Sequence, residues 1–406
     1  MKTERNREEH AQRFCRAASV SLALTAALLF SSSKCSIAAQ QHSPPAGFAT
    51  LAKQADAARD AQQLDKAVPL YRKALALNPR WTEGWWSLGT IYYDGDRYAS
   101  AADAFQHLAR LDPKQGTARA MLGLCEFELG DSAGALRDIE ASKGLGVLED
   151  EQLRQVVFYH EGLLLQRAGR FYAAQRALAS LCLGGVKSEE LTLTLGLVVL
   201  RMRDERPPAP GTADGEVVEH LGRGACLEAA KNYDQARPEF ESVVAKHPDY
   251  PSIHYAYGRF LLDDGDRDAA IREFQLQIEA DPGDVLSRLL IGATEIRVDD
   301  AAGLPYAEES VRMAPSSPLA HFVLGALLLD AGKDQEAISH LEIARKAFPA
   351  EQRLLWSLAS AYARVGRMQD AAQTRAAYLR VHSESSDAGS ADAPVEITDK
   401  MPAPQP

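Results

Sequence analysis

The stretch from Thr82 to Gln115 constrains the fold more than any other part of the sequence. Two short amphipathic segments are joined there by a turn, and their large and small residues follow a fixed spacing. Counted from Thr82 as position 1, the spaced residues are Trp85 at 4, Leu88 at 7, Gly89 at 8, Tyr92 at 11, Ala101 at 20, Phe105 at 24 and Pro113 at 32. Related spacings return about every 34 residues. A period of this length is typical of stacked helical hairpins, each of which buries its apolar face against its neighbours.

The spacing resembles the tetratricopeptide repeat (TPR), with W-x2-L-G-x2-Y, then A-x3-F, then P within 34 residues. The resemblance covers about residues 48–385. It implies an all-α fold, a right-handed α-solenoid of helix-turn-helix repeats whose concave groove binds peptides or protein segments. It brings no catalytic residues with it.

Measured against this pattern, the chain divides into two blocks holding about nine repeats. The predicted parts are a signal peptide (1–39), a linker (40–47), TPR block 1 (48–188, with repeats 48–81, 82–115, 116–149 and 155–188), an orphan helix with a Pro-rich loop (189–216), TPR block 2 (217–385, with repeats 217–250, 251–284, 285–317, 318–351 and 352–385) and a disordered tail (386–406). The loop is assigned because the prolines in 206–211 are too dense for a helix. The tail is rich in Ser, Asp, Ala and Pro and has little to bury.

The spaced residues have packing and chain-reversal roles. Small residues at positions 8 and 20 let the two helices of a hairpin approach, and large residues at 4, 7, 11 and 24 fill the space around that contact. A glycine at position 15 favours the left-handed backbone that ends the first helix. Such glycines are Gly130, Gly169, Gly265, Gly332 and Gly366.

The N-terminus has the pattern of a secretory signal. Basic residues precede an apolar run from Ala17 to Phe30, which is too short to span a bilayer but suits a signal peptide. Small residues offer cleavage after Ala38 or Ala39. We therefore expect a periplasmic or secreted protein with no integral membrane span after signal removal. The alternatives are a membrane anchor formed by an uncleaved N-terminus and a wrongly assigned start codon.

The net charge and the cysteine content bear on the kind of partner the protein binds and on whether it contains disulfides. The net charge is −11, and it is −14 without residues 1–39, which carry six basic and three acidic side chains. An acidic body argues against nucleic acid as the partner. Beyond the signal the cysteines are Cys125, Cys182 and Cys226. An odd, sparse set is not a disulfide framework, so we expect buried apolar fillers.

No cluster of residues with catalytic or metal-binding spacing is found. The ten histidines lack metal-site spacing, and no Gly-rich phosphate loop is present. His254 and His321 fall at position 4, where we interpret them as helix-packing residues. We expect neither an enzyme nor a bound metal or cofactor.

Positions that the repeat leaves free carry the binding hypothesis. Family geometry places positions 2, 5, 9, 12 and 13 on the concave surface, and position 5 is mostly large and apolar here. TPR modules that grip a terminal carboxylate use Lys at 5 and Asn at 9, and this chain has neither. The candidate partner-binding residues are Trp86, Thr90, Tyr93, Asp94, Tyr159, Arg167, Tyr255, Arg259, Phe322 and Trp356. Aromatic anchors with nearby arginines are typical of interface hot spots. Alternatively, position-5 side chains pack against neighbouring repeats and their apolarity is structural.

We therefore expect an exported scaffold that binds a protein or peptide partner in its groove through apolar, aromatic and a few charged side chains. The alternative is a structural or assembly component of an envelope complex, acting through self-association or convex surfaces.

Overall fold

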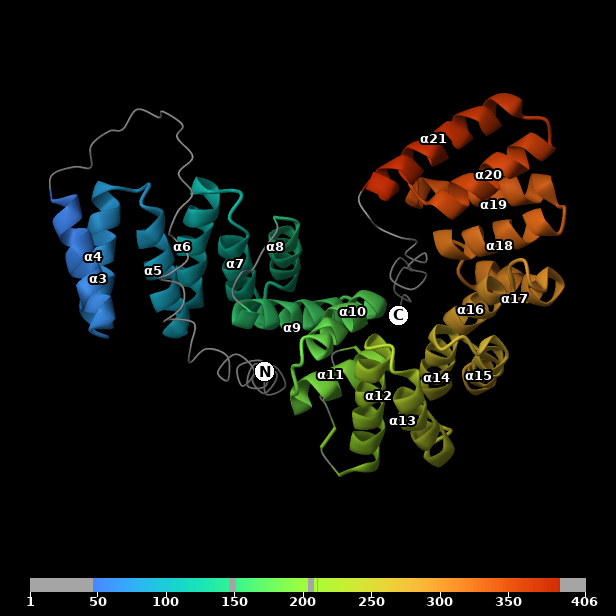
Figure 1. Ribbon diagram of the computed structural model, residues 1–406, viewed down its shortest axis with the longest axis horizontal. Helices are drawn as coiled ribbons and strands as arrows, with labels where there is room; N and C mark the ends of the chain where they lie inside the picture. Colours follow the sequence, from blue (N-terminus) through green and yellow to red (C-terminus); the bar gives the residue numbers. More distant parts are fainter. Residues whose placement is uncertain (1–46, 146–150, 204–207, 210, 388–406) are drawn as a thin grey trace. The chain divides into compact units, whose positions relative to one another are not determined.

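The computed structural model describes residues 47–145, 151–203, 208–209 and 211–387. Every regular element in these ranges is an α-helix (Figure 1), which confirms the all-α class. The predicted signal peptide and most of the predicted tail lie outside the described residues. Among the described helices, none combines the length and the apolar character needed to cross a membrane.

The chain forms two compact units, and the division falls within one helix, after Leu165. The helices of unit 1 are α3 (Phe48–Asp60), α4 (Leu64–Leu77), α5 (Thr82–Asp94), α6 (Tyr98–Leu111), α7 (Gly116–Glu128), α8 (Ser132–Gly144) and most of α9 (Glu151–Arg167). Helices α3 and α4, α5 and α6, and α7 and α8 pack in pairs as antiparallel hairpins (Figure 1).

Unit 2 contains the remaining helices. They are α10 (Phe171–Leu183), α11 (Glu189–Val199), α12 (Ala213–Ala229), α13 (Tyr233–Lys246), α14 (Ile253–Asp263), α15 (Arg267–Ala280), α16 (Val285–Glu295), α17 (Asp300–Met313), α18 (Pro318–Asp330), α19 (Asp334–Ala347), α20 (Gln352–Arg364) and α21 (Met368–Asp387). From α12 onward the helices again pack in sequential pairs.

Position 15 has left-handed backbone in eight of the nine predicted repeats, whether or not it is glycine, and the exception is repeat 285–317, where Asp299 has a φ of −143°. The five predicted glycines all have positive φ, between 73° and 86°. Gln62, Asp96 and Lys231 stand at the same position of their repeats with φ between 54° and 57°. The packing of the two helices, and not the residue type, therefore determines this left-handed turn. The same packing offsets the backbone strain of a non-glycine residue there.

The core of each hairpin forms where positions 8 and 24 meet. A Cβ added at Gly89 would lie 2.8 Å from the ring of Phe105, and one added at Gly258 would lie 2.6 Å from the ring of Phe274. Both phenylalanines are fully buried. Burying a phenylalanine contributes about 1.5–3 kcal/mol, so each such contact is a main source of hairpin stability.

The helix predicted as an orphan, α11, packs closely on α12. A Cβ added at Gly196 would lie 1.9 Å from the carbonyl oxygen of Val218, and one at Gly222 would lie 1.9 Å from that of Thr192. Only glycine at both sites lets the two backbones touch. Helix α12 also packs on α13, so α11, α12 and α13 form a three-helix group.

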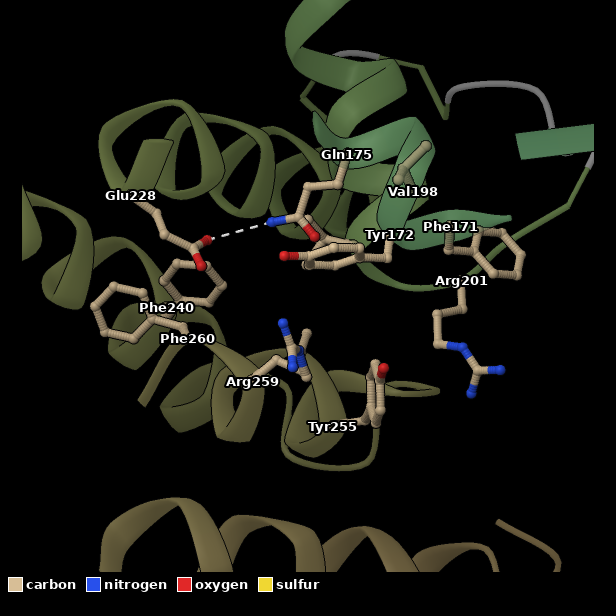
Figure 2. Close-up of a pocket in the computed structure, with 12 residues that line it drawn as sticks. Phe171, Tyr172, Gln175, Val198, Arg201, Glu228, Phe240, Tyr255, Arg259 and Phe260 are labelled. Atoms are coloured by element: carbon tan, nitrogen blue, oxygen red, sulfur yellow. Dashed lines mark hydrogen bonds between the residues drawn. The ribbon is translucent and has the colours of Figure 1, made fainter. Parts of the chain in front are cut away.

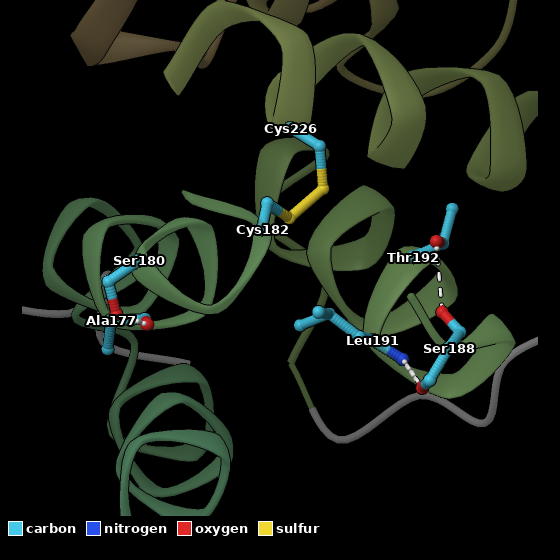
Figure 3. The surroundings of a disulfide bond; sticks show 7 residues. All are labelled: Ala177, Ser180, Cys182, Ser188, Leu191, Thr192 and Cys226. Atoms are coloured by element: carbon cyan, nitrogen blue, oxygen red, sulfur yellow. Dashed lines mark hydrogen bonds between the residues drawn. A yellow bond between two sulfur atoms is a disulfide. The ribbon is translucent and has the colours of Figure 1, made fainter. Parts of the chain in front are cut away.

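The expectation that all three cysteines are apolar fillers is wrong for two of them. Cys182 at the end of α10 and Cys226 near the end of α12 form a disulfide, with their Cα atoms 5.5 Å apart (Figure 3). Cys125 is free and buried, as expected. Repeat spacing could not reveal the bridge, because α11 and the Pro-rich segment are inserted between the two helices that it joins.

Candidate functional site

Four of the predicted binding residues lie on α5. Trp86 is half-buried, with its ring edge-on to Phe105 at a centroid distance of 5.6 Å. Thr90 is half-buried, and its hydroxyl donates to the carbonyl oxygen of Trp86 at 3.2 Å. Tyr93 is half-buried and Asp94 is exposed. The last turn of α5 therefore offers polar side chains, while Trp86 packs against a buried cluster formed by α6 and by Ala118 of α7.

The other predicted aromatic residues differ sharply in exposure. Tyr159, Tyr255 and Phe322 are between 2% and 6% exposed, whereas Trp356 in the last hairpin is 48% exposed. Arg167 is half-buried. At most position-5 sites, neighbouring helices thus cover the side chain. Trp356 is the predicted aromatic whose ring has the largest open surface.

A small pocket of unit 2 brings two predicted residues, Tyr255 and Arg259, together with residues that the sequence did not single out. The pocket has a volume of about 30 Å³ and lies among α10, α12, α14 and the end of α11 (Figure 2). Its principal polar and aromatic residues are Phe171, Tyr172, Arg201, Glu228, Tyr255 and Arg259.

Aromatic rings hold both arginines of the pocket. The guanidinium carbon of Arg201 lies 5.1 Å from the ring centroid of Tyr255 and 5.7 Å from that of Phe171. The guanidinium of Arg259 lies 5.6 Å from the ring centroid of Tyr172. These distances are within the range of cation–π attraction. Tyr255 stands between the two arginines in Figure 2.

The pocket is also lined by Glu228, a carboxyl group whose pKa is raised. Burial raises the pKa of Glu228 well above its usual value, and a hydrogen bond with Asp263 raises it further. The side-chain amide of Gln175 donates to the Glu228 carboxyl at 3.4 Å (Figure 2). Burial and a neighbouring carboxylate both favour the neutral acid, so Glu228 contributes less negative charge than its residue type suggests.

A larger groove in unit 1 is lined by residues of α4, α5 and α6. Its volume is about 560 Å³, within the range of ligand-binding clefts. Trp85, Leu88 and Tyr92 line it from α5. The Trp85 ring stacks on His107 at a centroid distance of 4.4 Å, and its N–H donates to the carbonyl oxygen of Pro79 at 2.8 Å. Trp85, expected only inside the repeat, therefore also lines a surface groove.

Arg201, Tyr172 and Glu228 were not among the predicted site residues. Arg201 follows the end of α11, outside any repeat, and has left-handed backbone with φ of 59°. Tyr172 stands at an unmarked position of its repeat, whereas Glu228 stands at position 12, one of the positions expected on the concave surface, and could have been found from that position. In the part of the chain that the structure describes, no group of three or more His, Cys, Asp or Glu side chains is arranged to hold a metal ion.

Solved structures to which this chain is similar include MamA, the Cut9–Hcn1 complex and Tom70. MamA residues 41 to the end from Desulfovibrio magneticus RS-1 is 17% identical, with a TM-score of 0.38, covering 41% of this chain and 94% of that one. The Cut9 and Hcn1 complex of the APC/C is 14% identical, with a TM-score of 0.36 and coverages of 84% and 88%. Yeast Tom70 is 12% identical, with a TM-score of 0.32 and coverages of 84% and 89%. Among curated proteins, none matches the sequence.

Two family models, both described as tetratricopeptide repeat, match the sequence in both units. One matches residues 227–291, and the other matches residues 52–116, 96–143, 301–342 and 328–387. Together the matched segments cover more than half of the 406 residues. They coincide with hairpins whose position-15 turns and position-8 contacts are described above. The chain belongs to the tetratricopeptide repeat family.

Proposed function

We propose that the protein is an exported scaffold, without catalytic activity of its own, that binds a protein or peptide partner through the helix faces predicted to form the groove. A TPR fold is typically a protein–protein interaction scaffold, and this family membership carries the proposal. The half-exposed Trp356 and the pocket containing Tyr255 and Arg259 support a role for unit 2 in the contact. Exposed aromatic and arginine side chains are the commonest anchors of protein interfaces.

The last hairpin offers the clearest apolar contact surface. The ring of Trp356 lies 5.5 Å from that of Tyr378, and Tyr378 stacks on His382 at 5.6 Å. Large half-exposed aromatic surface is costly in water and contributes binding free energy when a partner covers it. We therefore place one anchor of the partner on this aromatic row.

The disulfide between Cys182 and Cys226 supports the proposal of export. Stable disulfides form in the periplasm and outside the cell, and thiols are kept reduced in most cytosols. Expression of the full chain in its host, followed by intact-mass measurement of the mature protein, tests this directly. A mass beginning after Ala38 or Ala39 with two fewer hydrogens supports export, and a full-length reduced chain refutes it.

Partner capture tests the binding role. The full chain with a C-terminal affinity tag is compared with Trp356→Ala, and with Leu276→Ala as a control. Leu276 is 41% exposed on α15, so its substitution also removes exposed apolar surface. We expect Trp356→Ala to lose a specific partner that Leu276→Ala retains, with helicity unchanged by circular dichroism. Equal capture by both variants would remove the aromatic row from the interface.

Self-association is the second candidate function, because the last helix exposes apolar surface. Met368 is 66% exposed and Leu379 is 57% exposed on α21. Exposed apolar surface on the last described hairpin can serve as a contact between copies. Sedimentation velocity over a range of concentrations decides the matter. A concentration-independent monomer refutes assembly, and growth of larger species that Leu379→Ser abolishes supports it.

A further inference from the structure

The groove of unit 1 that α4, α5 and α6 line, here named the α4–α6 groove, is built from positions that are not expected on the concave surface. Trp85, Leu88 and Tyr92 line it from positions 4, 7 and 11 of α5, whereas the concave surface is expected at positions 2, 5, 9, 12 and 13. Its other lining residues come from α4, from the loop that follows α4 and from α6. A ligand of this groove would therefore bind outside the surface invoked by the proposed function.

The residues at positions 4 and 23 explain the open space beside Trp85. In four other hairpins a polar pair joins these two positions. The pairs, with the distance between their bonded atoms, are Arg119 and Asp138 (2.9 Å), His220 and Glu239 (2.6 Å), His254 and Glu273 (2.7 Å), and His321 and His340 (2.7 Å). The hairpin of α5 and α6 has Trp85 and Ala104 at these positions, and the methyl group of Ala104 cannot form such a bond.

The two aromatic rings of the groove are held by neighbouring side chains. Trp85 is half-buried, stacks on His107 and donates its N–H to the carbonyl oxygen of Pro79. Tyr92 is also half-buried, and the guanidinium carbon of Arg97 lies 4.4 Å from its ring centroid. Because both rings are already ordered, a ligand that packs against them pays little of the usual entropy of side-chain ordering.

The polar groups that line the groove are available to a ligand. Among the residues that the structure describes, no side-chain hydrogen bond or ion pair is formed by Arg72, Tyr92, Ser100 or Asp103. Arg72 comes from α4 and Asp103 from α6, so the groove carries one free charge of each sign. Opposite charges favour neither a polyanion nor a polycation. They suit an apolar segment whose backbone offers both acceptors and donors.

The spacing of the aromatic rings suits an extended segment. Trp85 and Tyr92 are seven residues apart on α5, which corresponds to a rise of about 10.5 Å. In a polyproline II helix, residues three apart lie on the same face and are separated by about 9.3 Å. An α-helix as long as the distance between the rings would occupy about 800–1,000 Å³. The groove volume of about 560 Å³ is too small for such a helix.

We propose that the α4–α6 groove binds a proline-rich segment of a partner protein in the polyproline II conformation. Two prolines three residues apart pack against Trp85 and Tyr92. The backbone carbonyls of a polyproline II helix form no internal hydrogen bonds, so they accept from the hydroxyls of Tyr92 and Ser100 and from Arg72. Asp103 accepts from a backbone N–H of a residue between the prolines. Aromatic-lined grooves are the usual receptors for such segments.

Binding of defined peptides to the full chain tests the proposal. Two blocked, fluorescein-labelled decapeptides contain three prolines and otherwise alanine, with the prolines at every third residue in one and adjacent in the other. Fluorescence anisotropy gives their affinities. We expect the spaced peptide to bind about tenfold more tightly, because a misplaced proline loses the burial of about two methylene groups. Equal affinities overturn the proposal, and so does tighter binding of a helix-forming peptide of the same length.

A blocking substitution locates the binding. Ser100 is exposed and lines the groove, so the side chain introduced by Ser100→Trp would occupy it. Ala99→Trp is the control, because Ala99 is exposed on the same turn of α6 and does not line the groove. We expect Ser100→Trp to lose at least tenfold in affinity for the spaced peptide and Ala99→Trp to bind normally, with helicity unchanged by circular dichroism. Normal binding by Ser100→Trp, or equal loss in both variants, overturns the proposal.

Tyr92→Phe tests the hydrogen bond while it keeps the aromatic ring. We expect affinity for the spaced peptide to fall about fivefold, the effect of one hydrogen bond. Tyr98→Phe is the control, because the Tyr98 hydroxyl donates to Asp96 at 2.7 Å and does not line the groove. An unchanged affinity in Tyr92→Phe refutes the contact of this hydroxyl with the segment.

Removal of residues 401–406 distinguishes a partner from the chain's own prolines, since this segment carries three of them. We expect the spaced peptide to bind the shortened chain and the full chain equally. Binding that is seen only after the removal would assign the groove to this segment of the chain and overturn the assignment to a partner.

Discussion

Removal of the disulfide between Cys182 and Cys226 is expected to destabilise unit 2 strongly. The bridge closes a loop with a sequence separation of 44 residues. The chain-entropy relation for a loop of that length gives about 13 cal/mol/K, or about 4 kcal/mol at 25 °C. The unfolded chain gains this entropy when the bridge is absent, while the helices it joins keep their other contacts.

Substitution of both cysteines by alanine, with hydrogen exchange as the assay, measures this effect. Global opening of α10 and α12 should become easier by about 4 kcal/mol, which is close to a thousandfold loss of protection. Helices α3 to α8, which belong to unit 1, should keep their protection. The apparent unfolding midpoint in urea should fall as well.

Cys125→Ala provides the matched control. Cys125 is free and buried, so its substitution leaves the bridge intact and creates at most a small cavity. Addition of a reductant should reproduce the double substitution in the wild type and in Cys125→Ala. Unchanged exchange in α10 and α12 after removal of the bridge would refute the loop-entropy reasoning.

Three further substitutions follow from the packing and hydrogen bonds. Gly222→Ala should lower the free energy of unfolding by about 1–3 kcal/mol or more, because the new Cβ would lie 1.9 Å from a backbone oxygen of α11. Urea unfolding measures this loss. Burial and neighbouring His321 lower the pKa of His340, so stability should be full above about pH 6.5 and fall as the pH drops through the lowered value. Unfolding free energies across that pH range should show a flatter slope for His340→Asn. Tyr71→Phe should cost about 1 kcal/mol, because the buried hydroxyl donates to Asp56 at 2.7 Å.

Each of these has a control within the chain. Gly144→Ala should be nearly neutral, because no atom lies within 4 Å of the added Cβ, and an equal loss at Gly222 and Gly144 would contradict the close-approach argument. If His340→Asn keeps the wild-type slope of unfolding free energy against pH, groups other than His340 cause the loss of stability at low pH. Tyr98→Phe removes an exposed hydroxyl and should cost less than Tyr71→Phe.

The hairpins could be predicted because each needs the same kinds of residue at the same positions, and these recur along the sequence. Position 15 illustrates this, since the five glycines there indicated left-handed turns and all five have positive φ. The sequence could not reveal that Gln62, Asp96 and Lys231 adopt the same turn. Packing of the two helices imposes the turn, and the residue at the position changes only its cost.

Exposure of the predicted binding residues was harder to predict. The repeat fixes which face of a helix a residue occupies, but not whether the next hairpin covers that face. Phe322 is buried at position 5, whereas Trp356 at the same position is half-exposed. Trp356 belongs to the last described hairpin, where no following repeat lies against it. A large aromatic residue at position 5 is therefore buried in one repeat and half-exposed in another.

The disulfide and the arginine pocket both occur where the 34-residue period is interrupted. Repeat spacing alone separates Cys182 from Cys226 and assigns no position to Arg201. The inserted helix α11, packed on α12 through Gly222, makes α10 and α12 neighbours and places Arg201 over Tyr255. Departures from local sequence rules are where functional sites are expected. A chain with an unbroken period would bring neither the two cysteines nor the two arginines together, so the pocket is a property of the insertion rather than of the repeat.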